Sequence, residues 1–234
     1  MNKITSYESL LHAVREFGLL PLFRNEVEGF SVEEMADERC WFPEEGEGVW
    51  EWKGPVIREG DIAYGKFFGG KAGFVTLDWF SHLVNIRRRG KVPKSLAGKV
   101  LEVYEAIRSH ESLLTSDIRK LCGFQRSNRL KGQPVLDVPV PKQPKSPSLE
   151  TILTRLEMQT LVVIADFEYR IDRYGQPYGW GVARYATPEV LFKPARLHAA
   201  TCFDPDVSLD RVCRHLSYYL PDADLSLLPK LIDY

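Results

Sequence analysis

The sequence predicts a mainly helical α+β protein with tandem winged-helix-like units and short β-hairpin wings. Two observations support this fold class. An amphipathic helix that begins at Leu149 runs into a two-stranded hairpin that ends near Thr187, and a helix followed by a hairpin is the second half of a winged helix. A second hairpin is indicated around Gly69-Gly70, and helical apolar spacing recurs on both sides of it.

The helix at Leu149 has one apolar stripe, because four side chains are spaced i, i+3, i+4 and i+7: Leu149, Ile152, Leu153 and Leu156. The apolar, β-branched run at 161–164 predicts a buried strand, and Trp180, Val182 and Tyr185 predict the return strand. Residues 170–176 form the polar tip between the two strands.

The N-terminal part has its own element signals. Residues 6–17 have helical apolar spacing and are followed by Gly18, which suits a helix end. Ser31 and Glu34 have the spacing of a capping box, so a short helix is expected there. The segment PEEGEGVWEWKGP is rich in Glu, Gly and Pro, and we interpret it as an acidic loop that leads into an aromatic turn.

The first hairpin is expected to have strands at 63–68 and 72–75, and Thr76 can cap a helix that ends near Gly90. Further helices are predicted at 96–107, 116–121, 208–220 and 225–232. The segment 125–148 contains five prolines and almost no periodicity, which predicts a long loop inserted before the helix at Leu149. No internal repeat of fixed period is visible.

These elements suggest three parts that together form one compact body. Residues 1–92 form an N-terminal helical, winged-helix-like unit with its hairpin near 63–75. Residues 93–192 form a winged helix with the long insertion at 125–148, and residues 193–234 form a C-terminal helical extension.

Composition narrows the class of protein. The chain is 44% hydrophobic and 12% aromatic, which is ample for a packed core. No apolar run approaches the roughly 20 residues that a membrane span needs, so we expect a cytoplasmic protein with no membrane contact. The four cysteines lack the C-x-x-C and Cys–His spacing of metal sites, so we predict no metal and no cofactor.

Charge is segregated along the chain although the net charge is only −1. Counting acids against bases gives 13 against 6 for residues 1–60, 8 against 16 for 61–150 and 11 against 9 for 151–234. A basic middle is typical of a protein with one face towards nucleic acid, because neutralising phosphates supplies most non-specific affinity. The alternative is a solvated basic face with no partner.

If double-stranded DNA is the partner, the helix at Leu149 and its hairpin should contact it. The candidate DNA-binding residues are Thr151, Thr154, Arg155, Arg170, Arg173, Lys145, Arg87, Arg88 and Arg89. The arginine run at 87–89 also has a stability explanation, since the macrodipole favours cations at a helix C-terminus. Glu150 and Glu157 lower the positive charge of the helix at Leu149.

Several aromatic and glycine blocks follow one another in order up to Thr187: Phe17-Gly18-Leu19, Phe30-Ser31-Val32-Glu33-Glu34, Trp50-Glu51-Trp52-Lys53-Gly54, Tyr64-Gly65-Lys66-Phe67-Phe68, Lys71-Ala72-Gly73-Phe74, Leu153-Thr154-Arg155-Leu156-Glu157-Met158-Gln159-Thr160 and Gly175-Gln176-Pro177-Tyr178-Gly179-Trp180. In these blocks the sequence resembles the AlkZ-related branch of the AlkZ/YcaQ-like superfamily of winged-helix DNA glycosylases.

The resemblance implies a Gln-x-Gln or Gln-x-Asp pair that places a water against the anomeric carbon of an alkylated nucleotide. This chain has no such pair in the corresponding region, and the nearest counterpart is Glu26-Val27-Glu28. If that segment is extended, Glu26 and Glu28 share a face, and a carboxylate can stabilise positive charge on a sugar. The alternative is that both belong to a solvated acidic segment, so enzymatic activity stays open.

Three functions therefore remain. The first is a DNA-binding protein related to alkylpurine-type glycosylases, which acts on or senses damaged DNA. The second is a non-catalytic scaffold or protein-interaction module without DNA affinity, in which the acidic N-terminal segment meets a protein partner. The third is an active glycosylase, which would release free base from alkylated duplex and lose that activity when Glu26 and Glu28 become Gln.

Overall fold

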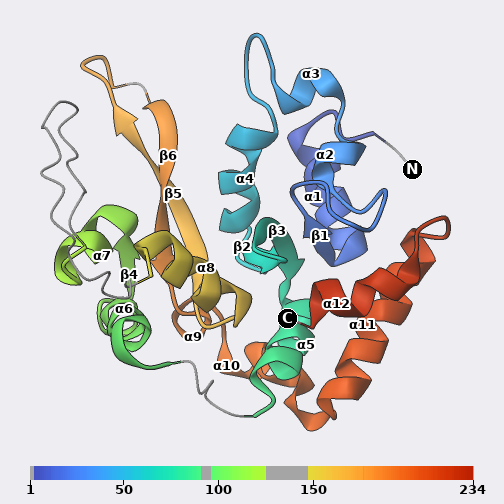
Figure 1. The fold of residues 1–234 in the computed structure, drawn as a ribbon. Coiled ribbons are helices and arrows are strands. Elements are labelled where there is room, and N and C mark those ends of the chain that lie inside the picture. The colour runs from blue at the N-terminus through green and yellow to red at the C-terminus, as the bar shows by residue number, and fades with distance from the viewer. Residues whose placement is uncertain (1–2, 91–95, 125–146, 176, 234) are drawn as a thin grey trace, which may run out of the picture.

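The chain forms two units with the same strand arrangement and a C-terminal helical extension (Figure 1). The computed structural model describes residues 3–90, 96–124, 147–175 and 177–233. The predicted insertion lies almost entirely outside the described residues. The mainly helical α+β fold class is confirmed by this architecture.

The first unit has a three-stranded antiparallel sheet covered by helices. Its elements in chain order are α1 (Tyr7–Phe17), β1 (Leu19–Pro21), α2 (Val32–Met35), α3 (Glu38–Trp41), α4 (Val49–Arg58), β2 (Ile62–Phe68) and β3 (Lys71–Thr76). The strands are arranged β1-β3-β2, so Phe74 of β3 pairs with Leu20 on one side and Tyr64 on the other. The helix α5 (Leu77–Arg88) follows directly.

The second unit follows a similar order, with two helices instead of three in the described residues between its first and second strands. Its elements are α6 (Gly98–Ser109), β4 (Ser112–Leu114), α7 (Thr115–Leu121), α8 (Leu149–Met158), β5 (Val163–Ile171) and β6 (Pro177–Ala186). Its sheet is arranged β4-β6-β5, which again places the last strand in the middle. Figure 1 shows the β5–β6 hairpin projecting from the rest of the unit. The two units therefore share one topology, although no sequence repeat of fixed period marks it.

One prediction in the first unit is wrong. Residues 49–58 form the helix α4 rather than an aromatic turn, with Pro55 inside it. Glu51 Oε2 accepts a hydrogen bond from the Gly48 backbone N–H (3.0 Å), which begins the helix, and Val49, Trp52 and Val56 are buried. Burial of this apolar stripe outweighs the hydrogen bond that proline removes.

The helix that precedes the hairpin in each unit packs against the hairpin of the other unit. α8 contacts β2, α4 contacts β5, and the two strands contact each other. Lys66 on β2 donates from Nζ to Thr154 Oγ1 on α8 (2.9 Å). Arg58 at the end of α4 forms an ion pair with Asp166 on β5 (2.7 Å). The contacts are reciprocal, and the buried side chains of both units join one hydrophobic core.

The C-terminal extension packs against α5 and α1. It consists of α9 (Pro188–Leu191), α10 (Pro194–Leu197), η1 (Ala199–Cys202), α11 (Pro205–Tyr219), η2 (Leu225–Leu227) and α12 (Leu228–Ile232). His215 on α11 stacks on Trp79 with 4.1 Å between ring centroids, and its Nε2 lies 2.9 Å from the Phe17 carbonyl oxygen. Among the described residues, no helix has the length and apolar character needed to cross a membrane.

Candidate functional site

The exposed edge of α8 carries two of the predicted DNA-binding side chains. Thr151 and Arg155 are exposed, whereas Thr154 is half-buried beneath the β2–β3 turn. A Cβ on Gly70 would lie 3.6 Å from Thr154 Cγ2, which shows how closely this turn approaches the helix. Thr154 also accepts the hydrogen bond from Lys66. The first unit therefore covers one side of α8 and leaves the Thr151–Arg155 edge open.

The β5–β6 hairpin carries two more of the predicted residues. Arg170 and Arg173 are exposed near its tip, and the Arg173 guanidinium lies 4.7 Å from the centroid of the Tyr174 ring. Neither arginine forms an ion pair with any other residue in the described ranges. Lys145 lies outside the described residues.

The arginine run at the end of α5 does not form a free basic surface. Arg87 donates to the backbone carbonyls of Ile232 (3.0 Å) and Met158 (2.7 Å), and also to that of Phe67. Arg88 is bound to Thr160 and Glu189, and Arg89 forms ion pairs with Asp206 and Asp233. These side chains connect α5 to the second unit and to the extension. Because all three are already bound by groups of the protein, the structure gives no support to their prediction as DNA contacts.

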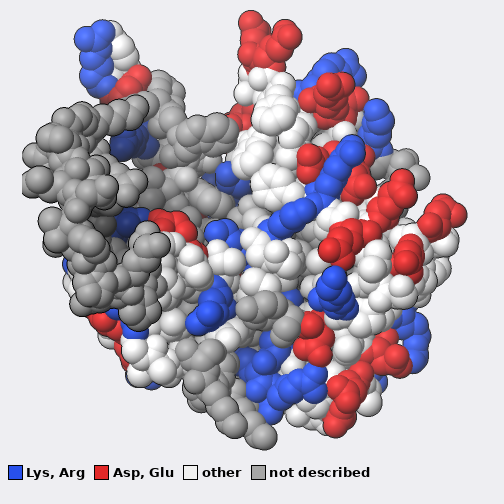
Figure 2. Space-filling view, in the orientation of Figure 1, with Lys and Arg blue, Asp and Glu red and all other residues white. Residues whose placement is uncertain are grey.

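The basic middle of the sequence is largely neutralised where it is described. Seven of the sixteen Lys and Arg residues between 61 and 150 fall in 91–95 and 125–146, outside the described ranges. Of the others, Lys99, Arg108, Arg119 and Lys120 pair with acids. Figure 2 accordingly shows blue and red side chains interspersed over the visible face, with red side chains dense on the side of α1 to α3 and α12.

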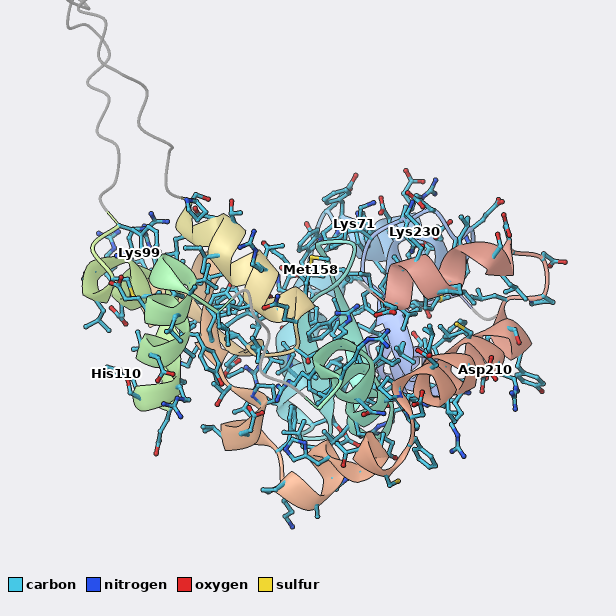
Figure 3. All side chains as sticks on the ribbon, turned by 60° about the horizontal axis from the view of Figure 1, so that its bottom comes forward. Lys71, Lys99, His110, Met158, Asp210 and Lys230 are labelled. Atoms are coloured by element: carbon cyan, nitrogen blue, oxygen red, sulfur yellow. The ribbon has the colours of Figure 1, made fainter. Side chains whose placement is uncertain are left out.

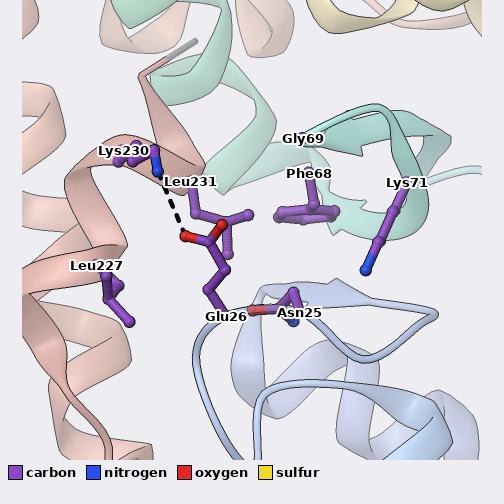
Figure 4. Close-up of a pocket in the computed structure, with 8 residues that line it drawn as sticks. All are labelled: Asn25, Glu26, Phe68, Gly69, Lys71, Leu227, Lys230 and Leu231. Atoms are coloured by element: carbon purple, nitrogen blue, oxygen red, sulfur yellow. Dashed lines mark ion pairs between the residues drawn. The ribbon is translucent and has the colours of Figure 1, made fainter.

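Glu26 lines a pocket of about 150 Å³ between the two ends of the chain (Figure 4). Its carboxylate lies 3.5 Å from Lys230 Nζ on α12, and both side chains are more than two-thirds exposed. The other lining residues are Asn25, Phe68, Gly69, Lys71, Leu227 and Leu231. The pocket thus combines an apolar floor with one carboxylate and two ammonium groups.

The loop that carries Glu26 is bent rather than extended, so the condition for Glu26 and Glu28 to share a face is not met. Residues 26–29 form a bend and a turn, with Val27 fully buried. Asn25 holds this shape, because its Oδ1 accepts from the Val27 N–H (2.9 Å) and its Nδ2 donates to the Phe30 carbonyl (2.7 Å). Glu28 is exposed and is not among the residues that line the pocket.

The pocket and α8 lie on the same side of the molecule. In Figure 3, Met158 at the end of α8, Lys71 on β3 and Lys230 on α12 follow one another across this side. Met158 is also close to the β2–β3 turn, since a Cβ on Gly70 would lie 3.9 Å from its Sδ. The exposed edge of α8 and the Glu26 pocket therefore lie on one side of the molecule, with the β2–β3 turn between them.

A buried carboxyl group lies between α8 and β2, at a position expected from the sequence to lower the positive charge of this helix. Glu157 is fully buried, its Oε1 accepts from the Lys66 backbone N–H (3.2 Å), and its Oε2 has no hydrogen-bond partner among the described residues. Burial raises the pKa of Glu157 to about 7, although the Lys66 ammonium opposes the effect. Helical periodicity could have revealed this position, because Glu157 follows the buried Leu153 by four residues.

A larger cavity of about 480 Å³ lies where α5, α6 and the η1 region meet. Leu101, Tyr104 and Leu161 form part of its apolar wall, and the Arg108–Glu105 ion pair lies at its edge. Of the predicted site residues it contains only Arg88, whose guanidinium is held by Thr160 and Glu189. The cavity therefore does not extend the surface between α8 and Glu26.

Comparison with known proteins gives one match. The model of a family described as AlkZ related matches residues 4–233, nearly the whole chain. No curated protein and no solved structure matches the sequence.

Proposed function

The chain belongs to the AlkZ-related family, and we propose on this premise that it binds duplex DNA through α8 and the β5–β6 hairpin. The family is described as AlkZ related, and the resemblance of the sequence to AlkZ-like DNA glycosylases points to DNA as the partner. The proposed surface consists of Thr151 and Arg155 on α8 and of Arg170 and Arg173 on the hairpin, which acts as a wing.

The observation that supports this proposal is that the arginines of this surface form no ion pairs with acidic side chains of the described residues. Arg155, Arg170 and Arg173 are exposed and form no ion pair with another described residue. The remaining described arginines of the second unit are all paired, as Arg108–Glu105, Arg119–Glu150 and Arg184–Glu168. An arginine without a carboxylate partner can bind a phosphate without first breaking an ion pair, and its planar fork suits bidentate phosphate contacts.

The test is the salt dependence of binding to a labelled duplex of about 20 base pairs, followed by fluorescence anisotropy. Replacing Arg170 and Arg173 by Ala should weaken binding and lower the slope of log K against log salt by about 0.9 for each lost phosphate contact. Arg155→Ala should act in the same direction.

Arg214→Ala is the matched control, because Arg214 is equally exposed on α11 and pairs only with Asp210. It should leave the slope unchanged. Absence of measurable binding at about 50 mM salt, or equal loss in all variants, would contradict the proposal and would favour a scaffold without DNA affinity.

A second candidate function is base excision at Glu26. The observation that favours it is the position of the Glu26 carboxylate in a pocket on the same side as α8. A phosphate that binds Lys230 would free this carboxylate to stabilise positive charge on a deoxyribose, as carboxylates do in glycoside hydrolysis. Glu26 is solvated in the free protein, so this role requires bound DNA to exclude water.

Release of free base from a duplex that contains alkylated purines, measured by chromatography, tests this second function. Glu26→Gln should abolish release, whereas Glu28→Gln should retain it because Glu28 lies outside the pocket. No release by the unmodified protein from a panel of alkylated duplexes would rule out excision and leave DNA binding standing.

A further inference from the structure

A patch of aromatic rings and glutamates lies on the first unit, around α3, α4 and the loop between them. Four rings contribute to this acidic–aromatic patch: Phe23, Trp41, Phe42 and Trp50. Five exposed glutamates surround them: Glu38, Glu44, Glu45, Glu47 and Glu51. Arg39 is the single base between residues 38 and 51, and it pairs with Asp37.

The rings form a connected cluster that is only partly covered. The Trp41 and Trp50 centroids lie 5.5 Å apart, Phe23 lies 6.0 Å from Trp41, and Phe42 lies 6.2 Å from Trp41. Phe42 is 68% exposed, and the other three rings are half-buried. A contiguous group of partly exposed aromatic side chains is typical of an interaction site, because folded proteins rarely leave large apolar patches in contact with water.

The glutamates beside the rings are not neutralised by the chain itself. Within the described ranges, Glu38, Glu44, Glu45 and Glu47 form no ion pair, and Glu51 only accepts the Gly48 N–H at the start of α4. Figure 2 shows red side chains grouped at the top of the loop between α3 and α4, above white side chains. The resulting negative potential repels phosphates and anionic lipid headgroups.

We propose that the acidic–aromatic patch binds a basic segment of another protein that carries an aromatic or aliphatic anchor residue. The anchor packs between Trp41 and Phe42, and its flanking Lys or Arg side chains pair with the glutamates of the 44–47 loop. Partly exposed tryptophans next to complementary charge have the character of binding hot spots, and Arg side chains gain further affinity from stacking on the rings.

The test uses the full chain and a synthetic peptide in which several Lys and Arg residues flank one central Phe. Trp41 and Trp50 lie in the patch, so saturable changes in tryptophan fluorescence should report binding. Replacing Phe by Ser in the peptide, or Phe42 by Ser in the protein, should weaken binding about tenfold, which is roughly the contribution of one buried anchor. A peptide with Glu in place of Lys and Arg should not bind.

The charge contribution has a matched control. The triple change Glu44→Gln, Glu45→Gln and Glu47→Gln should weaken binding at least about tenfold, whereas Glu16→Gln, Glu28→Gln and Asp222→Asn, which remove three exposed charges elsewhere, should not.

Equal loss in both triple variants, or indifference to the Phe anchor, would show non-specific charge attraction and overturn the proposal. A concentration-dependent dimer that depends on Phe42, seen by sedimentation, would assign the patch to a second copy of the chain instead.

Discussion

Replacing Glu157 by Gln should flatten the pH dependence of stability between about pH 5 and 8. Glu157 has an ordinary carboxyl pKa of 4.5 when exposed and about 7 in the folded protein, where burial destabilises its charged form. Because the folded-state pKa is raised, the folded protein binds the proton more tightly than the unfolded chain. The resulting stabilisation is fully present below about pH 4.5 and is lost as the pH rises through about 7.

The magnitude follows from these two values. The difference between 4.5 and about 7, at about 1.36 kcal/mol per pKa unit, corresponds to roughly 3 kcal/mol of unfolding free energy. The amide that replaces the carboxyl group in Glu157→Gln keeps an acceptor for the Lys66 N–H but cannot ionise. We therefore expect the free energy of unfolding of the wild-type protein to fall by about 2–3 kcal/mol relative to that of Glu157→Gln as the pH rises from about 5 to 8.

Urea unfolding followed by tryptophan fluorescence at several pH values measures this difference. The matched control is Glu150→Gln, which changes an exposed carboxyl group in the first turn of the same helix. Burial lowers the pKa of His82 and of His215, and both histidines contribute equally to the two proteins. Parallel pH profiles for the wild-type protein and Glu157→Gln would refute the reasoning.

Three further predictions, one of them with a control variant, concern the stability of the fold. Gly18→Ala should lower the free energy of unfolding by about 2–4 kcal/mol in thermal unfolding, because Gly18 has φ +69° and a Cβ would lie 2.1 Å from Trp79 Cδ1. The control is Gly29→Ala, which should lower it by only about 1 kcal/mol, because Gly29 has a similar φ of +74° but open space around it. Arg87→Met should lower the free energy of unfolding by about 3–5 kcal/mol and should speed amide hydrogen exchange in α12, because several buried carbonyl groups lose their hydrogen-bond donor. Lys53→Met should raise stability at pH 7 by about 1–2 kcal/mol and less at pH 10, because burial lowers the pKa of Lys53 and the folded state disfavours its charge; a destabilised variant at pH 7 would contradict this.

The long periodic elements were predictable from the sequence, and the short strands were not. α1, α5, α8 and the two hairpins follow from apolar spacing and turn residues alone. β1 and β4 have three residues each and exist because β3 and β6 offer them a free edge. α4 was missed because glycines and Pro55 suggest a turn locally, whereas its stability comes from burial against the rest of the unit.

The candidate site was predictable by residue type but not by environment. Arg87 and Arg155 look alike in the sequence, yet one donates to buried carbonyls from distant segments and the other is exposed to solvent. Glu26 was found from its place in the chain, but its pocket depends on Lys230 near the other end. Whether a charged side chain stays available to bind a ligand depends on hydrogen-bond acceptors and ion-pair partners that are distant in the sequence.

The reciprocal packing of the two units constrains how the proposed DNA complex can form. Direct reading of bases requires the side chains of one helix face to enter the major groove. The β2–β3 turn and Lys66 occupy the Thr154 side of α8, so only the Thr151–Arg155 edge can approach the duplex without separating the units. Separating them would expose Glu157 and break the Arg58–Asp166 pair. The edge and the wing are suited to phosphates, so the proposed binding should depend strongly on salt and weakly on base sequence.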